Sequence, residues 1–216
     1  MIKKLNVLIG IATLSIAGAT QAQNLITNGS FEADKVTPTG SYIDNMTPTA
    51  WFTSPGVDLI NTGYLGATAP DGVNFVGMTS SAGTPSFLSQ TINLAAGTYN
   101  LSFLYNGALG QSPATNLTYG LKDAHGALFT STLNVFAQNG NVTPWQTSSN
   151  NVTITTAGTY QLYFSSPTGP AGVNNGPFLD KVSVTSTAVP EPSASLALGV
   201  AGCLFLFRRR RKAGAV

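Results

Sequence analysis

The middle of the chain alternates apolar and polar side chains with a period of two, and this pattern restricts the fold most. Tyr99, Leu101, Phe103 and Tyr105 show the spacing clearly. The same spacing recurs at Leu117, Tyr119 and Leu121, at Phe129, Leu133 and Val135, at Val152 and Ile154, at Tyr160, Leu162 and Phe164, and at Val182 and Val184. Side chains two residues apart share one face of a β-strand, whereas a helix needs a period near 3.6. Because glycine and proline turns separate these segments, the pattern predicts an all-β fold of short strands.

One eight-residue sequence occurs twice in nearly the same form. Residues 96–103 read AGTYNLSF, and residues 157–164 read AGTYQLYF. In both copies the glycine relieves a tight turn, and the alternating aromatic and leucine side chains suit a core. Two such strands within one domain predict two facing sheets, which is a β-sandwich.

The N-terminal segment, residues 1–22, differs from the middle of the chain. It begins with Lys3 and Lys4, continues with an apolar stretch, and ends with the small-residue sequence Thr20-Gln21-Ala22. This order is typical of a secretory signal peptide that a signal peptidase removes. A retained N-terminal anchor is the alternative. Either way, the pattern predicts an exported domain at residues 23–188.

The C-terminal segment, residues 189–212, contains three parts in order. These are the motif Pro190, Glu191 and Pro192, an apolar run at residues 193–207, and a basic cluster of Arg208, Arg209, Arg210, Arg211 and Lys212. As a helix, the apolar run would span about 22 Å, which is shorter than the roughly 30 Å hydrocarbon core of a bilayer. The pattern predicts a short transmembrane helix whose basic end stays in the cytoplasm.

This arrangement resembles the PEP-CTERM sorting signal of Gram-negative bacteria that make exopolysaccharide. The resemblance implies recognition by an exosortase, a membrane cysteine protease, which would remove the tail near Pro190 to Pro192. The protein would pass through an inner-membrane intermediate and reach the cell surface or the extracellular matrix. A C-terminal anchor that is never cleaved is the alternative.

The distribution of charge argues against a nucleic-acid partner. Seven of the ten cations lie in the two ends, so the residues between them carry three lysines against eight acidic residues. A basic patch for nucleic acid is therefore missing from the domain sequence.

The only cysteine, Cys203, lies in the apolar tail, so the exported domain cannot form a disulfide.

The two ends of the domain carry a second resemblance. Residues 24–32 read NLITNGSFE, and residues 176–184 read GPFLDKVSV. These sequences resemble the first and last segments of galactose-binding-like jelly rolls, a group that includes many carbohydrate-binding modules. Trp51, Asp71-Gly72 and Trp145 also fall where such domains commonly have these residues. The resemblance implies a jelly-roll β-sandwich.

The same resemblance implies a structural calcium ion between the first and last strands. Glu32 and Asp180 match the side-chain ligands, and the carbonyl of Ser30 matches a backbone ligand. Calcium takes about six to eight oxygen ligands from carboxylates, carbonyls and water, which suits this set. In the alternative, Glu32 and Asp180 accept hydrogen bonds from backbone amides and cap the edge of the sheet. Both interpretations stay open at the level of the sequence.

Sugar binding requires exposed aromatic faces that stack on pyranose rings, with amide and hydroxyl groups around them. Trp145, Tyr105 and Tyr64 are the candidate ligand contacts, whereas Trp51 is expected in the core.

The sequence gives only weak evidence for an enzyme. The only histidine, His125, falls in a predicted hairpin turn, and the sequence contains no Gly-x-Ser-x-Gly elbow.

The sequence therefore predicts an exported, non-catalytic protein that associates with extracellular or cell-surface polysaccharide. The alternative is a structural surface or biofilm-matrix protein that binds no glycan.

Overall fold

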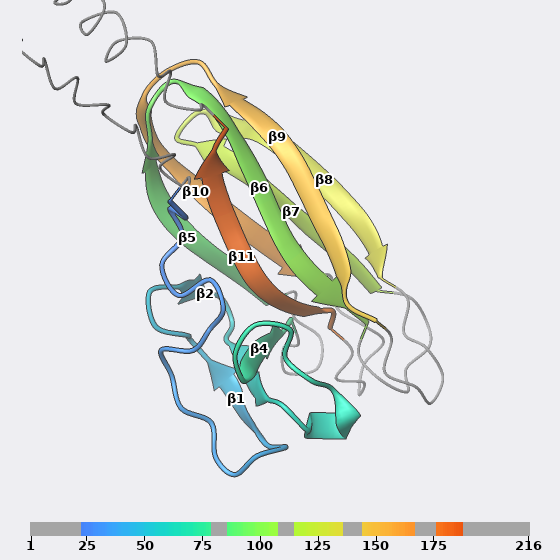
Figure 1. The fold of residues 1–216 in the computed structure, drawn as a ribbon. Coiled ribbons are helices and arrows are strands. Elements are labelled where there is room, and N and C mark those ends of the chain that lie inside the picture. The colour runs from blue at the N-terminus through green and yellow to red at the C-terminus, as the bar shows by residue number, and fades with distance from the viewer. Residues whose placement is uncertain (1–22, 79–85, 108–114, 136–143, 167–175, 188–216) are drawn as a thin grey trace, which may run out of the picture. The chain divides into compact units, whose positions relative to one another are not determined.

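The computed structural model describes residues 23–78, 86–107, 115–135, 144–166 and 176–187 (Figure 1). The predicted signal peptide, the Pro-Glu-Pro motif and the apolar run at residues 193–207 all lie outside these ranges. Within the described ranges, no helix is long and apolar enough to cross a membrane.

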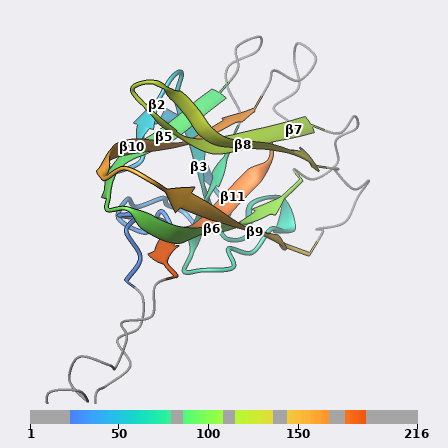
Figure 2. The same ribbon diagram turned by 90° about the horizontal axis from the view of Figure 1, so that it is seen from above.

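The described residues form two antiparallel β-sheets that pack face to face (Figures 1 and 2). The six-stranded sheet has the order β1 (Tyr42–Met46), β3 (Val57–Asn61), β4 (Asn74–Gly77), β11 (Phe178–Ser186), β6 (Gly97–Asn106) and β9 (Gln146–Ile154). The five-stranded sheet has the order β2 (Phe52–Thr53), β5 (Ser86–Leu94), β10 (Gly158–Ser166), β7 (Thr115–Asp123) and β8 (Gly126–Val135). A short 3-10 helix, η1, covers Tyr64–Gly66. The predicted all-β two-sheet sandwich is therefore confirmed.

The repeated sequence places one strand in each sheet, as predicted. The first copy forms β6 in the six-stranded sheet, and the second forms β10 in the five-stranded sheet. Phe103 and Phe164, the last residues of the two copies, meet across the interior with ring centroids 5.1 Å apart and planes at 89°. The first tyrosines of the two copies are also equivalent, because Tyr99 and Tyr160 each donate a hydrogen bond to a carbonyl four residues earlier. The repeat thus builds the centre of the sandwich.

The main core lies between the sheets and contains the predicted inward-facing residues. Leu117, Leu162 and Phe164 are fully buried, and Trp51 is 6% exposed. The indole Nε1 of Trp51 donates a 3.0 Å hydrogen bond to the carbonyl of Asn28. Since this bond satisfies the only polar atom of the ring, Trp51 can occupy the core, as predicted.

Strands β1 to β5 were not identified from the sequence, and burial explains why for β3 and β4. Every residue of β3 and of β4 is buried, on both faces of the sheet. The inner face joins the main core, whereas Ile60, Phe75 and Phe178 belong to a second cluster with Ala67 and Ala69. When both faces are buried, apolar residues need not alternate with polar ones, and the sequences VDLIN and NFVG show no period of two.

We expect Phe164→Ala to lower the free energy of unfolding by about 3–5 kcal/mol, because it removes a fully buried ring that contacts Phe103 and Tyr119. The matched control is Phe52→Ala, since Phe52 is 58% exposed. That change should stay within about 0.5 kcal/mol. Urea unfolding followed by tryptophan fluorescence measures both, and equal costs would contradict the described core.

Candidate functional site

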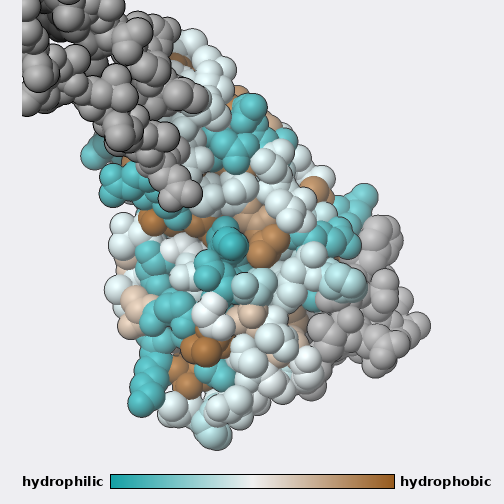
Figure 3. Space-filling model, viewed as in Figure 1, coloured by the Kyte–Doolittle hydropathy of each residue, from teal (hydrophilic) through white to brown (hydrophobic). Residues whose placement is uncertain are grey.

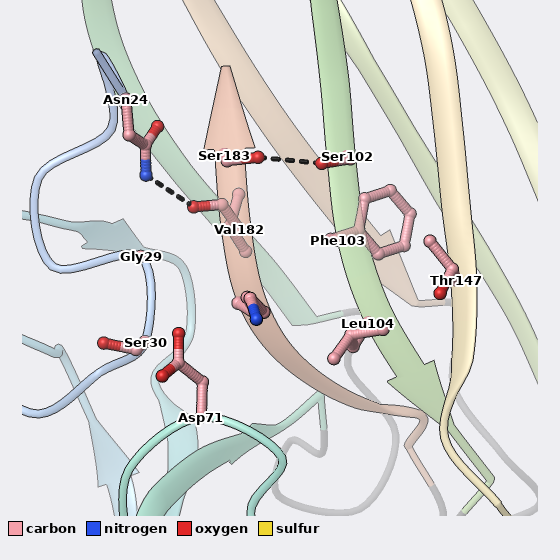
Figure 4. Close-up of a pocket in the computed structure, with 11 residues that line it drawn as sticks. Asn24, Gly29, Ser30, Asp71, Ser102, Phe103, Leu104, Thr147, Val182 and Ser183 are labelled. Carbon is pink, nitrogen blue, oxygen red and sulfur yellow. Dashed lines mark hydrogen bonds between the residues drawn. The ribbon is translucent and has the colours of Figure 1, made fainter. Parts of the chain in front are cut away.

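The N-terminal motif of the domain packs against the last strand, β11. The Leu25 amide donates to the carbonyl of Val184 at 2.8 Å, and the Val182 amide donates to the carbonyl of Gly29 at 2.8 Å. A Cβ atom at Gly29 would collide with the Val182 carbonyl oxygen, so the close approach requires glycine. The two motifs that carry the sequence resemblance therefore lie side by side (Figures 1 and 4).

A β-bulge in β11 directs Asp180 into this junction. The register between β11 and β6 shifts between Asp180 and Ser183, and Lys181 adopts a left-handed φ of 51°. Asp180 is 0% exposed. Its Oδ1 accepts from the Lys181 amide at 2.6 Å, and its Oδ2 accepts from the Asp71 amide at 3.1 Å. The bulge thus fixes a buried carboxyl group between β11 and the loop that precedes β4.

The environment of Asp180 favours its neutral form. Burial, the largest cause, and the nearby negative charges of Asp71 and Glu32 raise the pKa of the carboxyl group to about 8. The two amide hydrogen bonds oppose this pKa shift because they stabilise the carboxylate. Without a cation, Asp180 should therefore be largely protonated at neutral pH.

Glu32 occupies the outer part of the same junction. Its Oε1 accepts from the amides of Val73 at 2.9 Å and Asn74 at 2.7 Å. Gly72 has a φ of 80°, and a Cβ atom at this position would overlap the Glu32 carboxyl group. The Asp-Gly pair noted in the sequence therefore forms the turn that receives Glu32.

The predicted calcium ligands fit the ion only in part. Their oxygen atoms are of the type that calcium prefers, and the structure brings Glu32, Asp71 and Asp180 close enough to interact electrostatically. Among the described residues, however, no three acidic, histidine or cysteine side chains converge on one point that could hold a metal ion. The alternative hydrogen bonds from backbone amides are present for both Glu32 and Asp180. Calcium binding therefore stays a prediction.

A groove of about 420 Å³ opens beside this junction (Figure 4). It is lined by Asn24, Gly29, Ser30, Asp71, Ser102, Phe103, Leu104, Thr147, Lys181, Val182 and Ser183. Ser30 and Asp71 lie on the side of the N-terminal loop, whereas Ser102 and Thr147 lie across β11. Figure 3 shows polar or weakly polar residues over most of this face, with small hydrophobic patches. Phe103 turns its ring into the core, so the groove offers hydroxyl, amide and charged groups in place of an aromatic face.

Two of the three predicted ligand aromatics, Tyr64 and Trp145, flank the second hydrophobic cluster. The ring of Trp145 meets Phe75 edge-on at 5.6 Å, and its Nε1 donates to the Thr68 carbonyl at 2.8 Å. Tyr64 packs against Tyr42 at 5.0 Å. Both side chains keep part of their surface exposed, so a role in ligand binding stays a prediction.

Tyr105, the third candidate, pairs with Gln146, the residue after Trp145, but it faces the main core and not the second cluster. It packs against the main core beside Phe103, and its hydroxyl donates to Oε1 of Gln146 at 2.8 Å. The structure therefore does not gather the three predicted ligand contacts into one site.

The outer face of the five-stranded sheet carries an aromatic pair that sequence reasoning missed. Phe87 on β5 and Tyr163 on β10 have ring centroids 6.1 Å apart and planes within 15°. The hydroxyl oxygen of Tyr163 lies 2.8 Å from Oγ1 of Thr130 on β8. Gly120 lies opposite Tyr163 on β7, and a Cβ atom there would approach the Tyr163 hydroxyl to 2.8 Å. We call Phe87 and Tyr163 the ring pair.

Lys122 on β7 completes this surface. Its Nζ lies over both rings of the pair, 5.4 Å from each centroid. Hydroxyl and amide side chains occupy surrounding outward positions of the same sheet: Thr91, Thr118, Thr130, Gln161 and Ser165. This arrangement supplies what sugar binding requires, which is an aromatic surface bordered by polar groups.

The sequence did contain one signal for the ring pair. The two copies of the repeated sequence differ at their outward position, where Ser102 of the first copy is replaced by Tyr163 in the second. An aromatic residue at an outward position of a strand has no core to fill, so it indicates a surface role.

His125 lies in the exposed turn between β7 and β8, as predicted. The amides of His125 and Gly126 donate to Oδ1 of Asp123 at 2.7 and 3.0 Å. This pattern accounts for the turn through local hydrogen bonds.

Comparison with solved structures identifies domains of the same fold. The module TmCBM61, solved in complex with β-1,4-galactotriose, matches with a TM-score of 0.56 and 17% identity, over 76% of this chain and 99% of that one. A Stig cyclase from Fischerella sp. TAU matches with a TM-score of 0.58 and 18% identity, over 78% of this chain and 100% of that one. Part of the MgGH51 α-L-arabinofuranosidase also matches, with a TM-score of 0.52 and 18% identity, over 75% of this chain and 26% of that one.

No protein-family model matches the sequence, and no curated protein matches it. At these identities the structural matches show the fold alone. The domain therefore has a β-sandwich fold like that of carbohydrate-binding modules, and cyclases share this fold.

The raised pKa of Asp180 predicts a pH-dependent stability. In the unfolded chain this carboxyl group ionises near its ordinary value of 3.8, whereas in the folded protein it retains its proton up to about pH 8. Between these values the folded state binds more protons, so the free energy of unfolding should fall as pH rises, by on the order of 1 kcal/mol per pH unit.

Asp180→Asn removes the titrating group. Whatever the absolute stability of this variant, its free energy of unfolding should therefore fall less steeply with pH than that of the wild type. Urea unfolding in a metal-free buffer at several pH values between 4 and 8 measures the slope. An identical slope in the wild type and the variant would contradict the burial of Asp180.

Calcium would stabilise the ionised carboxylates at the junction. If the ion binds, millimolar calcium should raise Tm by several degrees at pH 8, and EDTA should reverse the change. Asp180→Asn should abolish the response, whereas Asp123→Asn, in the β7–β8 turn, should retain it. Equal Tm values in calcium and EDTA would establish that backbone hydrogen bonds alone hold the junction.

Proposed function

We propose that the domain at residues 23–188 is a non-catalytic module that binds polysaccharide through the outer face of its five-stranded sheet. The ring pair carries this proposal. Phe87 and Tyr163 are nearly parallel and partly exposed, so together they offer an extended aromatic surface. The apolar face of a pyranose ring packs on such a surface, and neighbouring hydroxyl and amide groups can bond the sugar hydroxyls.

The polar border of the ring pair supports a sugar ligand over a purely apolar one. Thr130 already lies within hydrogen-bond distance of the Tyr163 hydroxyl, and the Gln161 amide donates to Ser89 at 3.0 Å. Thr130 is exposed and Tyr163 is partly exposed, so their hydroxyl groups can exchange partners with a ligand hydroxyl. The fold shared with TmCBM61, which was solved with β-1,4-galactotriose, agrees with this function without establishing it.

Two observations favour binding over catalysis. Asp180, whose pKa is strongly raised, is fully buried and cannot touch a substrate in this conformation. His125 is exposed in a turn, and among the described residues its only hydrogen bond is the one its backbone amide donates to Asp123 in that turn. We therefore infer that the fold shared with the cyclases does not extend to their chemistry.

The terminal segments support a proposed route to the cell exterior. We infer export through the signal peptide at residues 1–22 and sorting by an exosortase that acts near Pro190 to Pro192. The support comes from the sequence, namely the resemblance of residues 189–212 to a PEP-CTERM signal. On this proposal, a galactose-binding-like jelly-roll module is delivered to the cell surface or the extracellular matrix, where polysaccharide is available.

Tyr163→Ala should weaken the binding of the full-length protein to its polysaccharide by about tenfold or more, because it removes half of the ring pair. Trp145→Ala is the matched comparison, since Trp145 is a partly exposed aromatic on the other sheet. Affinity electrophoresis against a panel of neutral and acidic polysaccharides measures the effect, with Tm as the control for folding.

If only Trp145→Ala weakened polysaccharide binding, the binding site would lie on the six-stranded sheet and not at the ring pair. A wild-type protein that binds no polysaccharide in the panel would favour the alternative, a structural surface or biofilm-matrix protein without glycan binding.

A further inference from the structure

We propose that Lys122 makes the ring pair selective for anionic polysaccharide, in which the sugar that stacks on the rings carries a carboxylate or sulfate group. This inference rests on the proposed function and adds the class of its ligand. The geometry points to Lys122 because its Nζ lies 5.4 Å from the centroids of both Phe87 and Tyr163. The charge is therefore centred on the surface where a sugar would stack.

Lys122 has no carboxylate partner among the described residues. In the described part of the chain, its side chain interacts with the two rings alone. The next residue, Asp123, uses its Oδ1 to accept from the amides of His125 and Gly126 in the β7–β8 turn. The positive charge of Lys122 is thus available for an external anion.

Lys122 is also the only charged residue among the outward positions of this sheet that the structure describes. The outward residues of β5 and β10 are Phe87, Ser89, Thr91, Asn93, Thr159, Gln161, Tyr163 and Ser165. Those of β7 and β8 are Asn116, Thr118, Gly120, Lys122, Leu128, Thr130, Thr132 and Asn134. The acidic residues of the junction, Glu32, Asp71 and Asp180, belong to the other sheet and its loops. Although the domain is acidic as a whole, this face presents one unopposed positive charge.

The lysine side chain can both cover the rings and bind a ligand. Its ammonium group sits on a flexible four-carbon stem, and its attraction to an aromatic face is modest at an exposed site. A sugar that stacks on the ring pair would displace the ammonium group to the edge of the pair. An anionic group on that sugar would then form a charge-assisted hydrogen bond with Nζ, whereas a neutral sugar would only displace it.

Polymers that differ in charge alone test the inference. We expect the full-length wild type to bind polygalacturonate about tenfold more tightly than the fully methyl-esterified polymer, which has the same backbone without the charge. A sulfated galactan and its desulfated form make the same comparison for sulfate. The preference should shrink as the salt concentration rises, since screening weakens the attraction at an exposed site.

Variants at position 122 assign the preference to the lysine. Lys122→Gln should weaken binding to the anionic polymer about tenfold and leave the neutral polymer unchanged or more tightly bound, whereas Lys122→Arg should retain the preference. Lys35→Gln is the matched control, because it removes the same charge from an exposed position outside this face. An equal effect of Lys35→Gln and Lys122→Gln would show a general charge effect and overturn the inference.

These measurements also distinguish the proposed selectivity of Lys122 from the proposed polysaccharide binding by the ring pair. If the wild type binds the charged and neutral polymers equally, and Tyr163→Ala weakens both, the selectivity of Lys122 is refuted and the proposed function stands. If none of these polymers binds, or if Tyr163→Ala leaves all binding unchanged, the ring pair is not the binding surface and both proposals fail.

Discussion

The structure depends on the burial of alternate aromatic and leucine side chains between two sheets. Phe103 and Phe164 meet at the centre, and Tyr119 packs against both rings. The domain contains no cysteine, so this contact and the strand pairing hold the sheets together without a disulfide. The same alternation that sends Leu162 and Phe164 inward sends Tyr163 outward. The core and the ring pair are therefore two consequences of one pattern on β10.

The junction between the N-terminal motif and β11 is stabilised by hydrogen bonds between buried polar groups, in contrast with the apolar core. Here polar groups are buried, and each is matched to a backbone partner: Gly29 and Val182 through their backbones, and Asp180 through two amides. Burying a carboxyl group is costly unless it is neutral, hydrogen-bonded or paired with a cation. Asp180 accepts two hydrogen bonds and has acidic neighbours, so we expect the stability of the junction to depend on pH, whereas calcium binding there stays a prediction.

The two outer faces of the sandwich offer different chemistry. The groove beside β11 has a mixed polar and apolar lining whose one ring, Phe103, is buried, whereas the opposite sheet presents two nearly parallel rings with a lysine over them. Sandwiches of this fold include a module solved with a galactotriose and a cyclase, so the fold leaves function undecided. The arrangement of Phe87, Tyr163 and Lys122 is what favours a stacked, anionic sugar as the ligand.

The sequence by itself determined the strands from β6 to β11, the sandwich, the burial of Trp51 and the importance of the two end motifs, because a period of two and a tight turn are local properties. Only the tertiary structure decided that β3 and β4 are covered on both faces, since that depends on the chain between residues 62 and 73. It also separated Tyr105 from Trp145 and Tyr64. It alone joined Phe87 to Tyr163, which are distant in sequence and become diagonal neighbours through the pairing of β5 with β10. Long-range strand register is set by the whole core, so no local pattern could have placed these two rings together.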